Sequence, residues 1–228
     1  MILDNAVWYS LTGPQRAFAR GNACALRFDP EVAPFSALPD DASDEAWAAL
    51  AGVVGPGRVA VLFRADTEPP AAWNVEMSIA GVQMVAPDYG GAPGNDIVEL
   101  GAADVPDMLD LVERTRPGPF FARTYELGRY VGIRDNGRLV AMAGERLRCE
   151  GHTEVSAVCT DRDYRGLGYA TRLVGDLVAN ISARGDTPFL HAAAENATAI
   201  HLYETLGFET RTRVDGLVVR APASDEGA

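Results

Sequence analysis

Hydrophobic and polar residues follow helix or strand periods along most of the 228-residue chain. Near the N-terminus, residues 43–55 carry apolar side chains at helical spacing behind Ser43, a favourable N-cap, and two acidic residues follow in the first turn. Three apolar runs have the length of short strands: residues 23–28, 58–63 and 81–86. This pattern predicts a small α/β unit.

The second half of the chain has stronger patterns. Residues 102–118 have apolar side chains at helical spacing and end in Pro-Gly. Residues 130–148 alternate on both sides of Asp-Asn-Gly, which accepts the positive φ angles of a tight hairpin. A further strand is predicted at 153–160, and shorter patterns predict strands at 95–101 and 188–193 and a helix at 196–203. Between the strands predicted at 153–160 and 188–193, one apolar stripe at helical spacing predicts a helix that ends by Gly185: Leu173, Val174, Leu177, Val178 and Ile181.

Residues 85–95 concentrate glycine, proline, aspartate and asparagine, which interrupt regular structure. We therefore divide the chain into residues 1–94, an α/β half whose role the sequence leaves open, and residues 95–228, which carry the motifs described below. No apolar run approaches the roughly 20 residues of a membrane span, and the first residues lack an apolar signal segment. We expect a cytoplasmic protein without a membrane partner.

Charge and composition exclude several functions. The formal net charge of −12, from 32 acidic and 20 basic residues, disfavours nucleic acid as a partner. Every basic residue is an arginine, so a Walker-type phosphate loop, which needs a lysine, is excluded. The cysteines and histidines lack the spacing of a disulfide framework or a metal site, so we expect a reduced compartment and no metal: Cys24, Cys149, Cys159, His152, His191 and His201.

A glycine-rich turn separates the strand at 153–160 from the next helix. Gly166 and Gly168 lack a Cβ and Ala170 is small, so an anion can approach the free backbone N–H groups at the start of the helix. A dinucleotide-binding G-x-G-x-x-G motif would require glycine at position 171, where the sequence has threonine. A helix entry whose glycines serve only close packing stays open at this point.

Two motifs resemble the GNAT superfamily of acyl-CoA-dependent N-acyltransferases. Residues 165–170, Arg-Gly-Leu-Gly-Tyr-Ala, resemble the family's Arg/Gln-x-x-Gly-x-Gly/Ala signature for the CoA pyrophosphate. Residues 196–208 resemble its later Asn-x-x-Ala-x-x-x-Tyr-x-x-x-Gly-Phe pattern. The resemblance covers about residues 95–220, and residues 154–170 further resemble the branch of glycine N-acyltransferase-like proteins.

The resemblance implies a fold, a co-substrate and a set of binding residues. The fold is of the α/β (α+β) class, a mixed, mostly antiparallel central sheet flanked by helices. The resemblance does not extend to residues 1–94, whose strand–helix–strand content can be interpreted as a degenerate GNAT-like unit that packs against the catalytic half and shapes the acceptor groove. The co-substrate is acetyl-CoA, and no metal takes part. The residues implied in binding acetyl-CoA are Val158, Cys159, Thr160, Arg165, Gly166, Leu167, Gly168, Tyr169, Ala170, Thr171 and Asn196.

The resemblance also implies catalytic roles. Tyr203 is suited to protonate the departing thiolate, and the alternative is a tyrosine that is merely buried. Glu154 is the expected base for the acceptor amine, with Glu126 and Glu145 as substitutes and a solvated strand-end residue as the alternative. Direct transfer needs no covalent intermediate, so Cys159 is not expected to act as a nucleophile.

The expected function is transfer of an acetyl group from acetyl-CoA to a primary amine of a small molecule, amino acid or peptide. A non-catalytic acyl-CoA-binding module would keep the glycine turn but need neither Glu154 nor Tyr203, and an interaction protein is a third class. Residues 115–128, rich in proline and aromatic residues, are a candidate specificity loop over the acceptor. The acceptor, the acyl-chain length and the oligomeric state stay open, a homodimer included.

Overall fold

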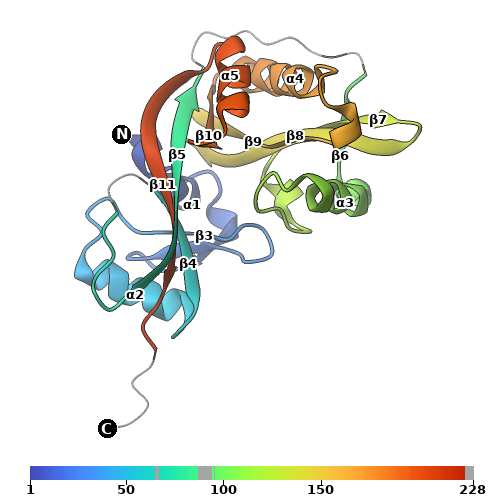
Figure 1. The fold of residues 1–228 in the computed structure, drawn as a ribbon. Coiled ribbons are helices and arrows are strands. Elements are labelled where there is room, and N and C mark those ends of the chain that lie inside the picture. Colours follow the sequence, from blue (N-terminus) through green and yellow to red (C-terminus); the bar gives the residue numbers. More distant parts are fainter. Residues whose placement is uncertain (65–66, 87–93, 95, 224–228) are drawn as a thin grey trace.

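The computed structural model describes residues 1–64, 67–86, 94 and 96–223, and its strands form one eleven-stranded sheet (Figure 1). The strand order is β1-β2-β3-β4-β11-β5-β10-β9-β8-β7-β6. The strands are β1 Ala19–Gly21, β2 Leu26–Phe28, β3 Phe35–Ala37, β4 Val59–Arg64, β5 Asn74–Val85, β6 Val98–Leu100, β7 Tyr130–Asp135, β8 Arg138–Cys149, β9 His152–Thr160, β10 Thr187–Ala193 and β11 Glu209–Arg220.

Most neighbouring strands are antiparallel, and in the described part of the chain the parallel neighbours are β3–β4 and β9–β10. The α-helices are α1 Ala6–Thr12, α2 Asp44–Val54, α3 Val105–Thr115, α4 Tyr169–Ala183 and α5 Ala197–Thr205. Single 3₁₀ turns are η1 Ile2–Asn5, η2 Arg16–Phe18, η3 Ala102–Asp104, η4 Thr124–Leu127 and η5 Arg162–Tyr164. This mixed, mostly antiparallel sheet with flanking helices confirms the predicted fold class.

Local signals explain several of these elements. α2 begins where expected, because the Ser43 hydroxyl accepts a hydrogen bond from the Ala46 N–H at 3.3 Å. The predicted hairpin is β7–β8, with Asn136 at φ 49° and Gly137 at φ 85° in its turn. Among the described residues, no helix combines the length and apolar character that crossing a bilayer requires.

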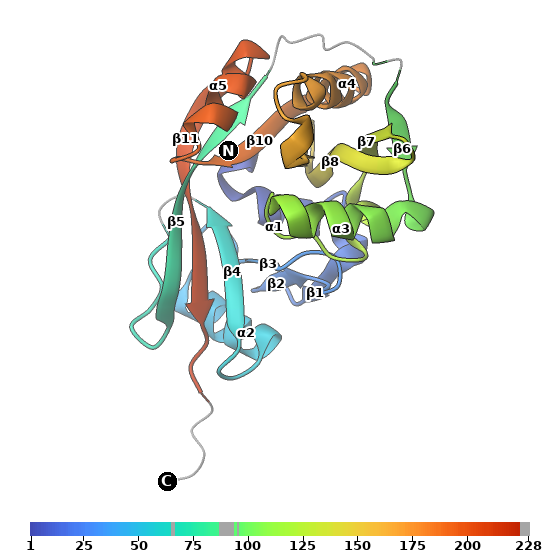
Figure 2. The ribbon, with the colours of Figure 1, turned by 45° about the vertical axis from the view of Figure 1, so that its right-hand side comes forward.

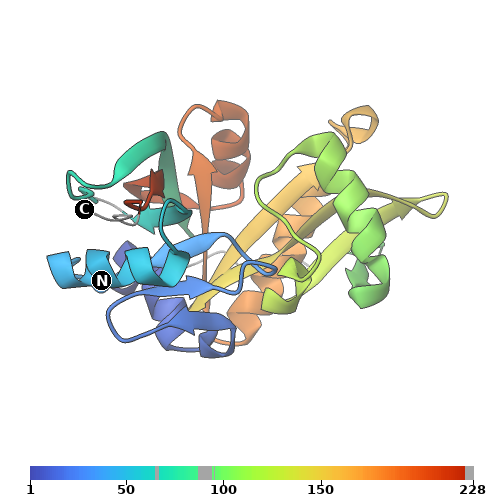
Figure 3. The ribbon, with the colours of Figure 1, turned by 90° about the horizontal axis from the view of Figure 1, so that it is seen from below.

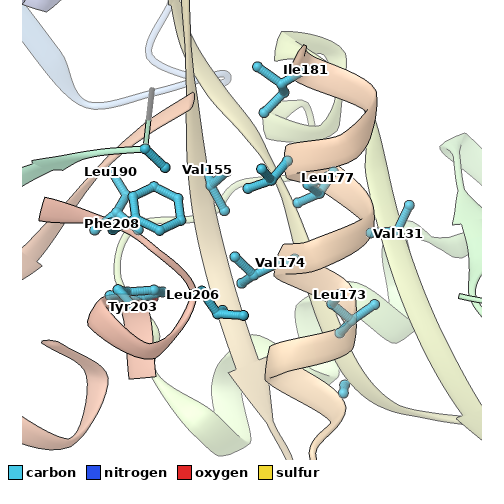
Figure 4. Close-up of a cluster of buried hydrophobic side chains, with 14 of the residues drawn as sticks. Val131, Val155, Leu173, Val174, Leu177, Ile181, Leu190, Tyr203, Leu206 and Phe208 are labelled. Atoms are coloured by element: carbon cyan, nitrogen blue, oxygen red, sulfur yellow. The ribbon is translucent and has the colours of Figure 1, made fainter. Parts of the chain in front are cut away.

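Helices cover both faces of the part of the sheet formed by β6–β9. α3 lies on one face and α4 on the other, as the green and orange helices of Figure 3 show. The apolar stripe of α4 packs against Val131 and Val155 of the sheet, together with Tyr203 and Phe208 (Figure 4). This packing fixes the start of α4 relative to the end of β9.

The sheet runs continuously between the two predicted parts of the chain. β5, from residues 1–94, lies between β10 and β11 (Figure 2). Gly81–Val85 pair with β10, while β5 pairs with β11 over nearly its whole length. Residues 87–93 and 95 of the predicted linker lie outside the described residues. Whether residues 1–94 and 95–228 are separate folding units stays a prediction, which the position of β5 makes testable.

We expect the chain to unfold as one unit. Met84 of β5 is fully buried in the core beneath α4, so Met84→Ala should lower the free energy of unfolding by about 2–5 kcal/mol. Urea denaturation followed by tryptophan fluorescence reports on residues 1–94, which contain all three tryptophans, and circular dichroism reports on the whole chain. Both midpoints should fall together.

Met77→Ala on the same strand is the matched control, because Met77 is 53% exposed. It should change the stability by less than about 0.5 kcal/mol. A fluorescence midpoint that separates from the circular dichroism midpoint would contradict a single unit and favour the division at residue 94.

Candidate active site

The cleft of this fold opens where β9 and β10 part. The two parallel strands are paired at three positions, His152–Glu154 opposite Thr187–Phe189. β10 then continues along β5, while β9 continues along β8. The backbone of residues 155–160 therefore has no strand partner on its β10 side among the described residues. The N–H and C=O groups on this side are available to a ligand, apart from the Thr160 carbonyl, which accepts a hydrogen bond from Arg165 Nε at 3.4 Å.

A β-bulge interrupts β9 within this open stretch. Gly144 pairs with Ser156 and Met142 pairs with Cys159, so Ala157 and Val158 together stand opposite one residue of β8. Ala157 has φ 53°, in the left-handed region that residues with a Cβ rarely adopt. The bulge turns the backbone at Ala157 and Val158 away from regular pairing with β8.

The resulting cleft has a volume of about 960 Å³ and is bounded by β9, β10, α5, the start of α4 and the end of α3. It brings together the predicted site residues other than Glu154 and Leu167. Leu167 is 57% exposed at the tip of the turn. The predicted residues that line the cleft are Val158, Cys159, Thr160, Arg165, Gly166, Gly168, Tyr169, Ala170, Thr171, Asn196 and Tyr203.

The glycine turn forms one end of the cleft. Gly166 has φ 80°, and Gly168, the N-cap of α4, has φ 76°, so both positions favour glycine. A Cβ at either position would meet no atom within 4 Å, so the turn faces open space. The first intrahelical bond of α4 runs from the Arg172 N–H to the Gly168 carbonyl, which leaves the N–H groups of residues 169–171 free. Free N–H groups and the positive end of the helix dipole suit a phosphate.

Tyr203 and Asn196 border the cleft from α5. The Tyr203 side chain is 8% exposed, and its ring packs edge-on against Phe208 at 5.9 Å between centroids. Burial raises the pKa of Tyr203 to about 12, so the phenol stays protonated. The Asn196 Oδ1 accepts a hydrogen bond from the Ala199 N–H at 3.1 Å, so Asn196 is the N-cap of α5 and its amide NH₂ is left for a ligand.

Glu154 lies beneath the cleft and is fully buried. The Arg146 guanidinium donates two hydrogen bonds to the Glu154 carboxylate, from Nε at 2.8 Å and from Nη2 at 2.6 Å. The Leu147 N–H donates a third at 3.2 Å. His191 Nδ1 lies 2.7 Å from the same carboxylate. Burial alone raises the pKa of Glu154, but Arg146 and His191 outweigh it and hold the pKa at about 2. Glu154 is therefore a carboxylate at neutral pH.

His191 completes this buried cluster and also lines the cleft. Burial lowers its pKa, against the opposing effect of Glu154, so the imidazole is neutral. Its partners assign the tautomer: Nδ1–H donates to Glu154, and Nε2 accepts a hydrogen bond from the Gln83 amide at 2.9 Å. The Gln83 Oε1 accepts from Arg211 at 2.5 Å, so the orientation of the amide is fixed. Both ring nitrogens of His191 are thus engaged.

The predicted substitutes for Glu154 lie outside the lining of the cleft. Glu126 pairs with Arg123 at 2.8 Å and Glu145 pairs with Arg184 at 2.9 Å. Burial raises the pKa of the Cys159 thiol to about 11, so this cysteine is a poor nucleophile at neutral pH. In the described part of the chain, no three side chains of histidine, cysteine, aspartate or glutamate come close enough to hold a metal ion.

Sequence reasoning missed Arg146 and treated His191 as an ordinary strand residue. The β8–β9 hairpin gives only an approximate signal for the Arg146–Glu154 pair, because its turn pairs Cys149 with His152 and a register shift between Arg148 and Glu145 then moves the pairing by one residue. No comparable signal marks His191, because β9 and β10 are joined through α4 and their register cannot be counted from a turn.

Comparison with known proteins places these features in a family. The family model described as "FR47-like protein" matches residues 130–215. The Escherichia coli [Ribosomal protein bS18]-alanine N-acetyltransferase is 28% identical over 147 residues, which cover 57% of this chain and 99% of that protein. The Mycobacterium tuberculosis N-alpha-acetyltransferase RimI is 37% identical over 86 residues, 35% of this chain and 51% of that one.

One solved structure matches nearly the whole chain. It is a crystal structure from Novosphingobium aromaticivorans that is assigned to the GNAT acetyltransferases, with 37% sequence identity and a TM-score of 0.89. The match covers 98% of this chain and 100% of that one. A GCN5-related N-acetyltransferase from Kribbella flavida shares the fold at 16% identity, with a TM-score of 0.64 and 96% and 95% coverage of the two chains. This chain therefore belongs to the GNAT family of N-acetyltransferases and is an acyltransferase enzyme.

Proposed function

We propose that this enzyme transfers an acetyl group from acetyl-CoA directly to a primary amine of a small molecule, an amino acid or a peptide. The observation that carries the proposal is the unpaired edge of β9, residues 155–160, which leads to a glycine turn at a helix N-terminus. The edge suits an extended amide-containing chain, and the turn suits a pyrophosphate. CoA contains both an extended amide-containing chain, the pantetheine arm, and a pyrophosphate.

The cleft residues fit acetyl-CoA in a defined direction. The pyrophosphate would lie on the N–H groups of residues 166–171, next to Arg165. The pantetheine arm would pair with the backbone of residues 158–160 and with the Asn196 amide. The Thr160 Oγ1 supports this fit, because it is buried and has no hydrogen-bond partner among the described residues. A buried hydroxyl without a partner costs free energy that a bound ligand can recover.

Tyr203 would stabilise the departing sulfur mainly by a hydrogen bond. Its pKa of about 12 lies about 3.5 units above that of an ordinary thiol, so full proton transfer to a thiolate would cost about 5 kcal/mol. A hydrogen bond to the developing thiolate carries no such cost. The backbone N–H groups at the bulge would polarise the thioester carbonyl in the same way.

We assign Glu154 a positioning role. Its carboxylate is fully buried and occupied by Arg146, Leu147 and His191, and a pKa of about 2 makes it a weak proton acceptor at neutral pH. Direct action as the base, the role that the sequence suggests, would require Glu154 to leave at least one of these partners. If Glu154 acted as the base through a water molecule, its own pKa would still be about 2.

Several finer expectations stay hypotheses. The names of two relatives specify a ribosomal protein's alanine and an N-alpha group, so we include peptide amines among the acceptors. Membership of the glycine N-acyltransferase-like branch, a cytoplasmic location and a homodimer are further hypotheses.

Incubating the enzyme with acetyl-CoA and a panel of primary amines should release free thiol in an amine-dependent way, and no release with any amine would contradict the proposed acetyl transfer.

Gly168→Val should weaken CoA binding at least tenfold, because the left-handed backbone at the N-cap of α4 strains a branched residue and the side chain enters the anion site. Gly185→Val is the matched control. Gly185 follows the other end of α4, with φ 84° and equal open space, so it adds comparable strain away from the cleft. Calorimetry should detect a loss of CoA affinity in Gly168→Val and not in Gly185→Val. Equal CoA affinities of the two variants would contradict a phosphate site at the turn.

Tyr203→Phe removes the phenol hydroxyl and little volume, so kcat should fall about 10- to 100-fold at nearly constant acetyl-CoA affinity. Tyr9→Phe is the control, because Tyr9 lies outside the lining of this cleft and its hydroxyl donates to Asp40 at 2.6 Å instead. Steady-state kinetics and calorimetry measure both quantities. A parental kcat in Tyr203→Phe would make Tyr203 a packing residue.

Glu154→Gln should reduce kcat/KM by a similar factor at every pH from about 6 to 9, because the parental carboxylate is charged throughout that range. Leaving Arg146 without its buried counter-charge should also cost about 3–5 kcal/mol of unfolding free energy. The control is Glu150→Gln on the exposed β8–β9 turn. Activity that recovers selectively at high pH would instead identify Glu154 as the base.

A further inference from the structure

Arg146 presents an unused hydrogen-bond donor to the inner end of the cleft. Its Nε and Nη2 both bind Glu154, and its side chain is 13% exposed. The third nitrogen, Nη1, makes no hydrogen bond among the described residues and is not one of their buried unpartnered atoms. Arg146 lines the cleft, and Nη1 is the one guanidinium nitrogen that no described residue engages.

The guanidinium is held rigidly in this orientation. The bidentate pair with Glu154 fixes its plane, and the Phe35 ring lies against it with the guanidinium carbon 4.9 Å from the ring centroid. Gln15 adds a tether by donating to the Arg146 carbonyl at 2.7 Å. A donor that is fixed before the ligand binds loses little entropy on binding.

Arg146 lies at the end of the cleft away from the glycine turn. The phosphate end is the turn at residues 166–168, and β9 runs back from there through the bulge at Ala157 to Val155 and Ser156. Arg146 and His191 line the cleft beside these last two residues. A molecule that attacks a thioester held near the bulge from this end of the cleft would lie next to Arg146.

The charges beside Nη1 balance. Arg146 is neutralised by Glu154, and His191 is neutral, so this corner carries strong donors without net positive charge. A neutral carbonyl oxygen matches such a donor, whereas a carboxylate would bring an uncompensated charge next to the buried Glu154.

We propose that Nη1 of Arg146 donates a hydrogen bond to the oxygen of a carbonyl group that is bonded to the carbon bearing the acceptor amine. The acceptor is then an α-amino acyl compound with a neutral carbonyl, as at a peptide N-terminus, and Arg146 is its specificity residue. This inference rests on the proposed acetyl transfer to a primary amine. It also explains why Glu154 is buried without lining the cleft, since its role is to hold Arg146.

Alaninamide and isopropylamine test this assignment, because they share the carbon that bears the amine and differ in the carbonyl group. With the parent enzyme, kcat/KM per neutral amine should be at least tenfold higher for alaninamide. Arg146→Lys keeps the charge beside Glu154 but loses the fixed Nη1 donor. It should reduce kcat/KM about 10- to 100-fold for alaninamide and less than about threefold for isopropylamine.

The ratio of kcat/KM for alaninamide to kcat/KM for isopropylamine is compared between the parent and the variant. The difference in pKa between the two amines is the same for both enzymes and cancels. Arg148→Lys, on the same strand and 48% exposed, is the matched control and should keep the parental ratio. An unchanged acetyl-CoA affinity confirms that Arg146→Lys is folded, and the comparison of acceptors with the parent enzyme does not depend on the variant.

Three results would each overturn the inference while leaving acetyl transfer intact. The first is equal use of both amines by the parent, and the second is an unchanged ratio in Arg146→Lys. The third is a higher kcat/KM for free alanine than for alaninamide, which would identify a carboxylate as the ligand of Arg146. No thiol release with any of the three amines would contradict the proposed function itself.

Discussion

The Glu154 carboxylate joins three strands at the last position where β9 and β10 are paired. From β9 it binds Arg146 of β8 and His191 of β10, and Phe189, its register partner, is followed by the divergence of the two strands. The backbone edge for a ligand, the bulge at Ala157 and the inner wall of the cleft all depend on where this divergence begins. Any other arrangement of these strands would be much less stable, because loss of one partner would leave the charge of Glu154 or Arg146 unpaired in a nonpolar interior.

The N-terminal part of the chain supports this junction from one side. Phe35 of β3 covers Arg146, Phe63 of β4 packs edge-on against His191 at 4.5 Å, and Gln83 of β5 fixes the imidazole. The candidate specificity loop is anchored there too, since the Thr124 hydroxyl donates to the Val32 carbonyl at 2.6 Å. Residues 1–94 therefore contribute side chains that pack against the inner end of the cleft, although their sequence alone did not show which side chains do so.

Local patterns predicted most of the catalytic half, and long-range pairing explains what they missed. The glycine turn, α4 and the β7–β8 hairpin follow from spacing within about 20 residues, so the sequence located the end of the cleft that the glycine turn forms. β5 was predicted only from residue 81 onward, although Val75, Met77 and Ile79 alternate with polar residues as in a strand, and its pairing depends on β11, more than 120 residues later. Glu154 was recognised as important, but its burial depends on residues from β3 to β10 that no local pattern connects.

Amide hydrogen exchange with and without acetyl-CoA tests most directly whether the unpaired edge of β9 holds the acetyl donor. Without ligand, the amides of residues 155–160 that face β10 should exchange faster than those paired with β8. Adding acetyl-CoA should slow exchange in residues 155–160 and 166–171, while β7 and α3 stay unchanged. Protection confined to another region, with residues 155–160 unaffected, would contradict this account of the cleft.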